Sequence, residues 1–547
     1  MTSAKSHRGK LAGGGSVAER SPGFGFARRG LWEAVLILAF LLVCGFDILH
    51  HAMWRDEMLP WLFARDSATI PDLFKNMRYE THPRLWYLIL FGITRITSNP
   101  AAMQAANFLI IGLAIALFVR FCPLPFYLKA LTVFGYFFVY EWGTLSRNYA
   151  LGVLLCFAFC TLFPKRGKGY LGLAAILFLA TQANHYAALQ VAALGGLLIF
   201  EAWTKPELRS RIRTHRWDAA LSVFLVFGGV LLAFWIGIPQ PDAGIHIFDL
   251  GLGLGVKITH SFIAFWAGFV PLSEPSLLNS WVMGMLGHTL LGAAELRVIL
   301  GMILFPLTVV FFWRSHPIMW TYLGGASLLL LLASVKFNNY ARHTGHFFLW
   351  FLICLWLAHY FPESSGSPKT RPFKLSLSQK LFLCPLLLIH IFDSVFLSIA
   401  GYYYPFSCSK AVALYLEQNH LKGLPIVGYP DYIAMPVAGY AGVRIYYPDT
   451  RRWGSFVIEN DKRQTDWTED EIMKSVSEFA AQGNHDFLLL LNGPLMIVRD
   501  NQLYEVRQLG DLHEEASFHP SMVGDEIYWL YRYKTPPTSS PEPSRAP

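Results

Sequence analysis

The stretch LWEAVLILAFLLVCGFDIL, residues 31–49, decides the fold class of this chain. A helix needs roughly 20 predominantly apolar residues to cross the hydrocarbon core of a bilayer, and this run provides them. It follows Arg28 and Arg29 and ends without the small-residue cleavage site of a signal peptide. Because basic residues stay on the cytoplasmic side, we expect a first transmembrane helix whose N-terminus is cytoplasmic.

The chain as a whole has the composition of a polytopic α-helical membrane protein. Hydrophobic residues make up 54% of its 547 residues and charged residues only 15%, whereas a soluble domain carries about 25% charged residues. Further apolar runs predict about eleven transmembrane helices in total, in a range of about 10 to 13. These runs lie near residues 101–119, 126–141, 148–163, 170–185, 187–203, 219–238, 298–313, 318–335, 346–361 and 381–400.

Topology explains the net charge of +8. Basic residues gather between the apolar runs, at intervals that place them on the cytoplasmic face under the positive-inside rule. The clusters are Arg120 with Lys129, Lys165 with Arg166 and Lys168, the run 205–216, Arg314, and Lys369 with Arg371, Lys374 and Lys380. The excess of Lys and Arg therefore indicates which loops lie inside, and we expect no nucleic-acid partner.

Two further apolar segments affect which side of the membrane each basic cluster faces. The clusters stay on the cytoplasmic side only if neither segment crosses the membrane exactly once. We assign RLWYLILFGITRI, residues 84–96, to an interfacial helix, because a crossing there would move nearly every basic cluster to the outside. Residues 247–292 must cross either twice or not at all, and we expect a hairpin at the outer face.

The chain divides into four parts. Residues 1–30 are Gly/Ser-rich and basic, which predicts a disordered cytoplasmic tail, and residues 31–400 form the transmembrane domain with a first outer loop at 50–100. In residues 401–534 the apolar runs LPIVGY, VRIYYP, HDFLLLLN and DEIYWLYRY alternate with the amphipathic SKAVALYLEQN and TEDEIMKSVSEFAAQ. This alternation predicts an extracytoplasmic α/β domain. The Pro/Ser-rich end, residues 535–547, is expected to be disordered.

The first outer loop carries acidic side chains at the membrane edge. Asp56 and Glu57 are adjacent, and Glu80 and His82 follow before the interfacial segment. A carboxylate there can take a proton from a hydroxyl group or, with a neighbour, hold a divalent cation such as Mg²⁺ or Mn²⁺. Asp56, Glu57 and His82 are the candidate metal ligands, although the sequence shows no complete ligand set. The alternative is a solvated helix start, in which both acids complement the helix dipole.

The order of these motifs resembles the GT-C superfamily of integral-membrane glycosyltransferases. The similarity is greatest to the bacterial branch related to protein O-mannosyltransferases and lipid A aminoarabinose transferases. An Asp-Glu pair follows the first helix, and a His-Pro pair with an aromatic/leucine run comes about 25 residues later. EWGTLSRNYAL (141–151), NHYAAL (184–189) and NNYARHTGHFF (338–348) are similar to further motifs of the family at outer helix ends. The resemblance covers roughly residues 31–410.

The resemblance implies transfer of a sugar from a polyprenyl-phosphate carrier at the extracytoplasmic side of a bacterial plasma (inner) membrane. It implies that Asp56 is the base that deprotonates the acceptor, with inversion at the anomeric carbon, and that Glu57 positions the acceptor or a metal. The acceptor group, a hydroxyl or a phosphate of a glycan, lipid or protein, stays open. The donor sugar also stays open, because His82 stands where aminoarabinose transferases have lysine and is followed by one proline where relatives often have two.

Cationic side chains on the same face are expected to hold the donor phosphate. The leaving group becomes more negative as the sugar departs, so cations aimed at it stabilise the transition state more than the ground state. Arg147, Arg342 and His343 are the candidates, and arginine is favoured because its guanidinium binds phosphate bidentately and stays charged. The alternative is that the arginines snorkel from helix ends to lipid headgroups.

Several further side chains are candidates for substrate binding. They are Glu80, His82, Glu141, Tyr149 and His185. Of these, Glu141 is expected to pair with Arg147, six residues further along the chain.

Two other functions fit a protein with many crossings. A transporter or flippase of lipid-linked substrates would also need charged side chains, but transporters usually place them at mid-membrane in broken helices, often within inverted repeats. Here the charges gather at one face, which favours chemistry at the membrane surface. The second alternative is a noncatalytic membrane scaffold that presents the domain at 401–534.

Overall fold

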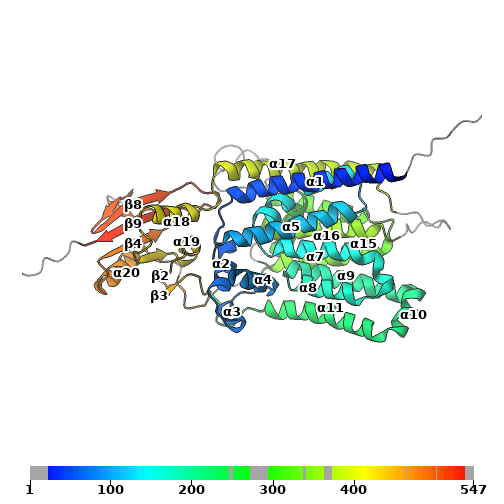
Figure 1. Ribbon diagram of the computed structural model, residues 1–547, viewed down its shortest axis with the longest axis horizontal. Helices are drawn as coiled ribbons and strands as arrows, with labels where there is room; N and C mark the ends of the chain where they lie inside the picture. Colours follow the sequence, from blue (N-terminus) through cyan, green and yellow to red (C-terminus); the bar gives the residue numbers. More distant parts are fainter. Residues whose placement is uncertain are drawn as a thin grey trace, which may run out of the picture.

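The computed structural model describes residues 22–244, 251–271, 294–336, 340–361, 373–464, 466–499 and 502–535. They form an elongated molecule with a helical bundle at one end and a smaller α/β domain at the other (Figure 1). Most of the two predicted tails and part of the predicted hairpin lie outside the described residues.

The bundle is built from helices that run mainly along the long axis of the molecule. They are α1 (Pro22–His50), α2 (Arg55–Arg65), α3 (Ile70–Asn76), α4 (Leu85–Thr94), α5 (Ala101–Phe121), α6 (Phe126–Val133), the π-helix η1 (Phe137–Thr144), α7 (Tyr149–Leu162), the 3-10 helix η2 (Phe163–Lys168), α8 (Leu171–Thr181), α9 (His185–Thr204), α10 (Pro206–Thr214), α11 (Arg216–Ile236), α12 (Leu254–Phe269), α14 (Ala294–Val310), α15 (His316–Val335), α16 (Ala341–Ala358) and α17 (Leu377–Tyr403).

Among the described residues, seven helical segments are long and apolar enough to cross a membrane. They are Arg28–His50, Ala101–Phe121, Tyr149–Lys168, His185–Thr204, Arg216–Ile236, His316–Val335 and Leu377–Tyr403. The other four predicted spans are also helical, in α6 with η1, α8, α14 and α16, but they do not meet the same criteria of length and composition. The membrane character of the chain is therefore clear, while the count of about eleven crossings stays a prediction.

The structure bears on two predictions, the end of the N-terminal tail and the nature of the segment 84–96. The cytoplasmic tail was expected to reach residue 30, but α1 begins at Pro22, so the prediction is wrong for residues 22–30. Proline suits the first turn of a helix because the amide hydrogen that it lacks has no partner there. The segment 84–96 forms the short helix α4, which at ten residues is about 15 Å long and cannot cross a core of roughly 30 Å.

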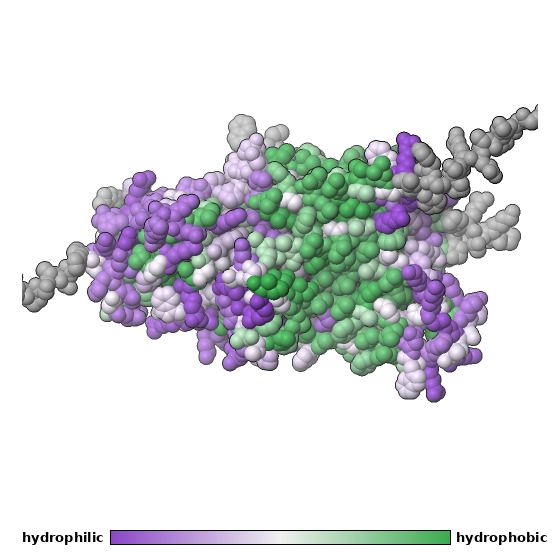
Figure 2. Space-filling view, viewed as in Figure 1, coloured by the Kyte–Doolittle hydropathy of each residue, from purple (hydrophilic) through white to green (hydrophobic). Residues whose placement is uncertain are grey.

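Exposed apolar side chains cover the outside of the bundle. On the face that Figure 2 shows, hydrophobic residues form a band over the helices, with hydrophilic residues at both ends of the molecule. Leu38 and Leu42 on α1, and Phe224 and Phe227 on α11, are each more than half exposed. Soluble proteins rarely expose an apolar patch of this extent, whereas a lipid bilayer covers such a band.

The segment predicted as an outer-face hairpin enters the bundle instead. Ser261 Oγ on α12 donates to the carbonyl oxygen of Leu330 on α15 at 3.1 Å. A Cβ on Gly268 would lie 2.5 Å from the carbonyl oxygen of Thr344, so glycine permits α12 to pack closely on α16. The hairpin prediction is therefore wrong for residues 254–269. The positions of the basic clusters restrict how many times a segment crosses the membrane, but not how deeply it enters the bundle.

The C-terminal domain has the predicted α/β character. Its seven-stranded sheet has the order β3-β2-β1-β4-β9-β8-β7, in which β2, β1 and β4 are parallel. The strands are β1 (Ile426–Tyr429), β2 (Ile445–Tyr447), β3 (Arg452–Gly454), β4 (Asp486–Leu491), β7 (Gln508–Leu509), β8 (Leu512–Phe518) and β9 (Tyr528–Lys534), with β5 (Met496–Arg499) and β6 (Gln502–Glu505) in a separate pair. The helices are α18 (Ser409–Gln418), α19 (Asp431–Ala441) and α20 (Glu469–Ala481).

The sequence predicted the strands β1, β2, β4 and β9 and the helices α18 and α20, and all of these are confirmed. It did not predict α19, whose apolar sequence contains Pro436 and shows no clear periodicity.

The C-terminal domain packs directly on the first loop of the bundle. Arg55, at the start of α2, donates from Nη1 to Asp525 at 2.8 Å and from its backbone N–H to Oε1 of Glu526 at 3.0 Å. A Cβ on Gly439 would lie 2.3 Å from the sulfur of Met58, so any other residue there would displace the Met58 side chain from between α19 and α2. The contact joins the domain to the loop that carries the predicted acidic residues.

Candidate functional site

The adjacent acids at the start of α2 point in different directions. Successive residues of an α-helix are about 100° apart around its axis, so two neighbours cannot face the same side. Trp61, four residues after Glu57 and therefore on the same side of α2, is fully buried. As a result Glu57 is fully buried, whereas the Asp56 side chain remains 28% exposed.

Asp56 is held between two arginines from distant parts of the chain. Nη2 of Arg342, in the first turn of α16, lies 2.8 Å from Oδ2 of Asp56, and Nη1 of Arg147 lies 2.9 Å from the same oxygen. Neither contact uses the second oxygen, Oδ1. Burial by itself would raise the pKa of Asp56, but the charges of Arg147 and Arg342 outweigh it and hold the pKa below its ordinary value. Asp56 is therefore an ionised carboxylate.

Glu57 supports the loop that carries one of these arginines. Its Oε1 accepts a hydrogen bond from the backbone N–H of Ser146 at 2.6 Å, and its Oε2 lies 2.7 Å from Nε2 of His51. Arg147 directly follows Ser146, and its Nη1 also donates to the backbone carbonyl of Asp56 at 2.7 Å. We therefore regard Glu57 as a residue that positions Arg147, not as one that contacts a substrate.

Asp56 lines a cavity of about 390 Å³ at the end of the bundle that carries the C-terminal domain. The described wall comes from six separate parts of the chain: α2 with the residues before it, the turn at 79–82 with the start of α4, the loop at 147, Pro239 with Ala243, Lys336 with residues 340–343, and Glu459 of the C-terminal domain. Such a composite wall cannot form until the bundle and the domain have packed together.

The turn at 79–82 contributes an acid and a histidine to the cavity. Oε2 of Glu80 accepts a hydrogen bond from Tyr87 OH at 2.8 Å and lies 3.1 Å from Nδ1 of His82. His185 supports this turn from behind, because its Nε2 donates to the carbonyl oxygen of Thr81 at 2.7 Å. Glu80 and His82 thus line the cavity, whereas His185 holds the turn and does not line it.

A lysine that the sequence reading missed adds a third cation. Nζ of Lys336 lies 2.9 Å from Tyr186 OH and 3.1 Å from Nε2 of His343, which in turn lies 3.1 Å from Tyr149 OH. Burial, together with the charges of Arg342 and Arg147, lowers the pKa of Lys336 to about 7. Its signal in the sequence was a lysine at the end of an apolar run on the predicted outer face, where the positive-inside rule leaves few.

The expected pairing of Glu141 with Arg147 is wrong. Oε2 of Glu141 accepts a hydrogen bond from Tyr136 OH at 2.6 Å, while Arg147 binds Asp56. The reason is the π-helix η1, in which residues five apart fall on one side, so Tyr136 and Glu141 meet. Glu141 is buried and does not line the cavity.

The candidate metal ligands are not brought together. Within the part of the chain that the structure describes, no group of three His, Cys, Asp or Glu side chains is arranged to hold a metal ion. Glu57 faces His51 in the interior, while Asp56 and His82 line the cavity. The trio of Asp56, Glu57 and His82 is therefore not a metal site in this structure.

Six of the ten predicted site residues line one cavity. They are Asp56, Glu80, His82, Arg147, Arg342 and His343. Of the other four, Tyr149 contacts His343 from behind, and Glu57, Glu141 and His185 lie in the surrounding structure.

Comparison with known proteins adds nothing to the motifs. The chain matches no protein-family model and no curated protein sequence. The resemblance to the GT-C superfamily therefore stays a prediction from short sequence motifs, and the function is argued from the geometry of the cavity.

Proposed function

We propose that the protein is an inverting glycosyltransferase that moves a sugar from a polyprenyl-phosphate carrier to an acceptor at the outer face of a bacterial plasma membrane. The observation that carries the proposal is the carboxylate of Asp56 held by Arg147 and Arg342 inside a cavity at the end of an apolar bundle. A lipid-anchored donor requires this position, because its chain stays in the membrane while its phosphate reaches the edge.

The cations suit the donor phosphate. Arg342 keeps its Nε buried without a hydrogen-bond partner among the described residues, although its Nη2 binds Asp56. A buried N–H without a partner is costly, and a phosphate oxygen would satisfy it. Arg147 and Lys336 line the same cavity, so two charged arginines and a lysine that is protonated part of the time are available to balance the charge of the leaving phosphate.

Asp56 suits the role of the base. Its Oδ1 is free of both arginines and would take the proton of the acceptor hydroxyl. When a donor phosphate binds Arg147 and Arg342, it shares the charge that now holds the pKa of Asp56 low. Donor binding would therefore make Asp56 a stronger base at the moment when the sugar is in place.

The positions of the basic clusters support the proposed orientation in the membrane. Arg120 lies near Arg29, since both bind Glu33, and α10 with its arginines lies at the end of the bundle opposite the C-terminal domain (Figure 1). By the positive-inside rule this end is cytoplasmic, and about eleven crossings would then place the cavity and the domain outside.

A transfer assay tests the proposed function. The full-length protein is reconstituted in liposomes with decaprenyl-phosphate sugars, one panel member for each common hexose and pentose, and with a mixture of lipid, glycan and peptide acceptors. Release of decaprenyl phosphate and transfer of the sugar to an acceptor are measured. We expect one donor to be consumed by the wild type and consumption to be lost in Asp56→Asn and Arg342→Ala. Arg444→Ala, which removes an exposed arginine of the C-terminal domain, is the matched control. Equal consumption in all four proteins would disprove the proposed site, and movement of intact lipid between leaflets would indicate a flippase.

A labelling experiment tests the orientation separately. Asp461 is exposed on a loop beside the cavity, and the native cysteines are buried or partly buried. In right-side-out vesicles, Asp461→Cys should react with a membrane-impermeant maleimide without permeabilisation. Reaction only after permeabilisation would place the cavity on the cytoplasmic side and overturn the assignment.

A further inference from the structure

The cavity has one wall that the bundle does not provide. Among its described lining residues, Glu459 is the single contribution of the C-terminal domain. Nη1 of Arg463 binds Oε2 of Glu459 at 2.8 Å and so fixes the carboxyl group, which keeps 21% of its surface exposed. Arg463 is itself anchored, since its Nε lies 2.9 Å from Oδ2 of Asp431.

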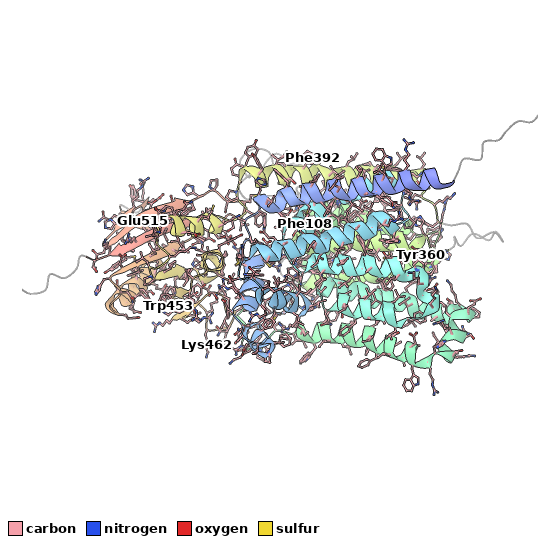
Figure 3. The ribbon with its side chains drawn as sticks, in the orientation of Figure 1. Phe108, Tyr360, Phe392, Trp453, Lys462 and Glu515 are labelled. Carbon is pink, nitrogen blue, oxygen red and sulfur yellow. The ribbon has the colours of Figure 1, made fainter. Side chains whose placement is uncertain are left out.

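The loop that carries Glu459 is fastened to the bundle at the cavity. The backbone N–H of Gly244 donates to the carbonyl oxygen of Glu459 at 3.0 Å, and that of Asp461 donates to the carbonyl oxygen of Asp242 at 2.9 Å. A Cβ on Gly244 would lie 2.4 Å from the carbonyl oxygen of Asn460, so glycine is required for this contact. Lys462, labelled in Figure 3, marks the loop at the junction of domain and bundle. The position of Glu459 is therefore built into the fold.

The same wall belongs to the edge at which α/β sheets usually bind ligands. Asp431 and Asp449 each lie two residues after the end of a strand, Asp431 after β1 and Asp449 after β2. Both are therefore at the carboxyl ends of parallel strands. Open α/β sheets bind their ligands at this edge. Because Arg463 links Asp431 to Glu459, the edge faces the cavity of the bundle.

The wall that Glu459 forms is acidic, whereas the wall that Arg147 and Arg342 form is basic. Burial raises the pKa of Glu459 to about 7, against the charge of Arg463 and with the help of the nearby negative charges of Asp431, Glu80 and Asp56. An acidic group repels a phosphate but binds sugar hydroxyls, and a carboxyl group that is protonated part of the time can both donate and accept hydrogen bonds. Tyr79 also lines the cavity, as aromatic residues do in sugar sites.

We propose that Glu459 is an acceptor-binding residue that hydrogen-bonds a hydroxyl of a glycan acceptor, so that the C-terminal domain supplies the acceptor half of the site. The assignment rests on the proposed function, in which Arg147 and Arg342 hold the donor phosphate. It gives the domain a part in the reaction: the sugar is transferred between a donor held by the bundle and an acceptor oriented by the domain. Arg463 is the positioning residue for Glu459.

The test compares donor and acceptor kinetics in the full-length protein in liposomes. The acceptor probes are cellobiose, maltose, chitobiose and mannobiose, added to the decaprenyl-phosphate sugar that the wild type consumes. In Glu459→Gln, which keeps an oxygen for Arg463, we expect the acceptor KM to rise about 10-fold, as for loss of a charged hydrogen bond, with the donor KM unchanged. Glu459→Asp should recover part of the loss. Asp461→Asn, an exposed acid two residues away, is the matched control.

Each result decides one of the two proposals. A rise in acceptor KM confined to Glu459→Gln supports the inference, and unchanged thermal melting shows that the variant is folded. Kinetics of Glu459→Gln equal to those of Asp461→Asn would overturn the inference and leave the glycosyltransferase standing, as would wild-type transfer to lipid or protein but to none of the glycans. Failure of the wild type to consume any donor would overturn the proposed function, and the acceptor assignment with it.

Discussion

At each end of the helical bundle, one carboxylate lies between two positively charged side chains. At the end opposite the C-terminal domain, Arg166 binds both carboxylate oxygens of Glu201, at 2.5 Å each, and Lys205 binds the same group. The Glu201 side chain is only 1% exposed. At the domain end, Arg147 and Arg342 share one oxygen of Asp56, whose side chain stays 28% exposed and lines the cavity.

The two clusters differ in whether they are closed. Glu201 uses both oxygens, and Arg166 also stacks on Phe163 at 4.1 Å from the ring centroid, so the cluster fastens η2 to α9. Asp56 keeps Oδ1 apart from its arginines. The same residue types therefore serve structure where every atom is paired, and are available for chemistry where one atom faces a cavity.

The largest effect is expected when Asp56 loses its charge. Asp56→Asn keeps the size of the side chain but removes the proposed base, so transfer should fall by about 10²–10⁴-fold. The measurement is the initial rate of sugar transfer by the reconstituted protein. A rate within a few-fold of the wild type would show that the open cluster is no more catalytic than the closed one.

The second effect separates charge from geometry at Arg342. Arg342→Ala should slow transfer by about 10²-fold, because a cation that stabilises the leaving phosphate is lost. Arg342→Lys keeps the charge without the guanidinium fork, so an intermediate rate is expected. Affinity for decaprenyl phosphate, measured alongside, should follow the same order. An unchanged affinity in Arg342→Ala would contradict the phosphate role.

The third effect uses Glu526, an acid with one arginine instead of two. Burial raises the pKa of Glu526 to about 7, against the charge of Arg55. An unfolded Glu titrates near 4.3, so the folded state binds more protons between about pH 4.3 and 7, and the free energy of unfolding falls as the pH rises through that window. Glu526→Gln should remove this pH dependence, which amounts to about 1–3 kcal/mol of the free energy of unfolding across the window.

The midpoint of thermal unfolding, recorded at pH 5 and at pH 8, checks this prediction. The wild type should lose stability between the two pH values more strongly than Glu526→Gln. Equal losses in both proteins would mean that Arg55 holds Glu526 ionised, as Arg147 and Arg342 hold Asp56.

The smallest effect on transfer is expected at the closed cluster. Glu201→Gln leaves Arg166 and Lys205 without their buried acid and should lower stability by about 1–3 kcal/mol. Transfer per folded molecule should not change, because Glu201 lies at the end of the bundle away from the cavity. A loss of transfer as large as that of Asp56→Asn would remove the distinction between the two clusters.

Part of the candidate site could be predicted from the sequence, because few charged residues lie on the predicted outer face of the membrane domain. That scarcity singled out Asp56, Arg147 and Arg342, and all three line one cavity. The same reasoning could not find Glu459, because acidic residues are common in a soluble domain and nothing in the sequence states which of them faces the bundle. The wrong partner predicted for Glu141 has a similar origin, since the π-helix that brings it to Tyr136 has no signature in the sequence.

The sequence by itself determined that this chain belongs in a membrane and where the strands and helices of most of its length lie. Those properties depend on local hydrophobicity and periodicity, which each segment carries alone. Only the tertiary structure decided that Asp56 faces the cavity while its neighbour Glu57 supports Arg147, and that Lys336 and Glu459 join them. The rotation of a helix and the docking of a domain depend on side chains far apart in the chain, so their outcome is settled by packing.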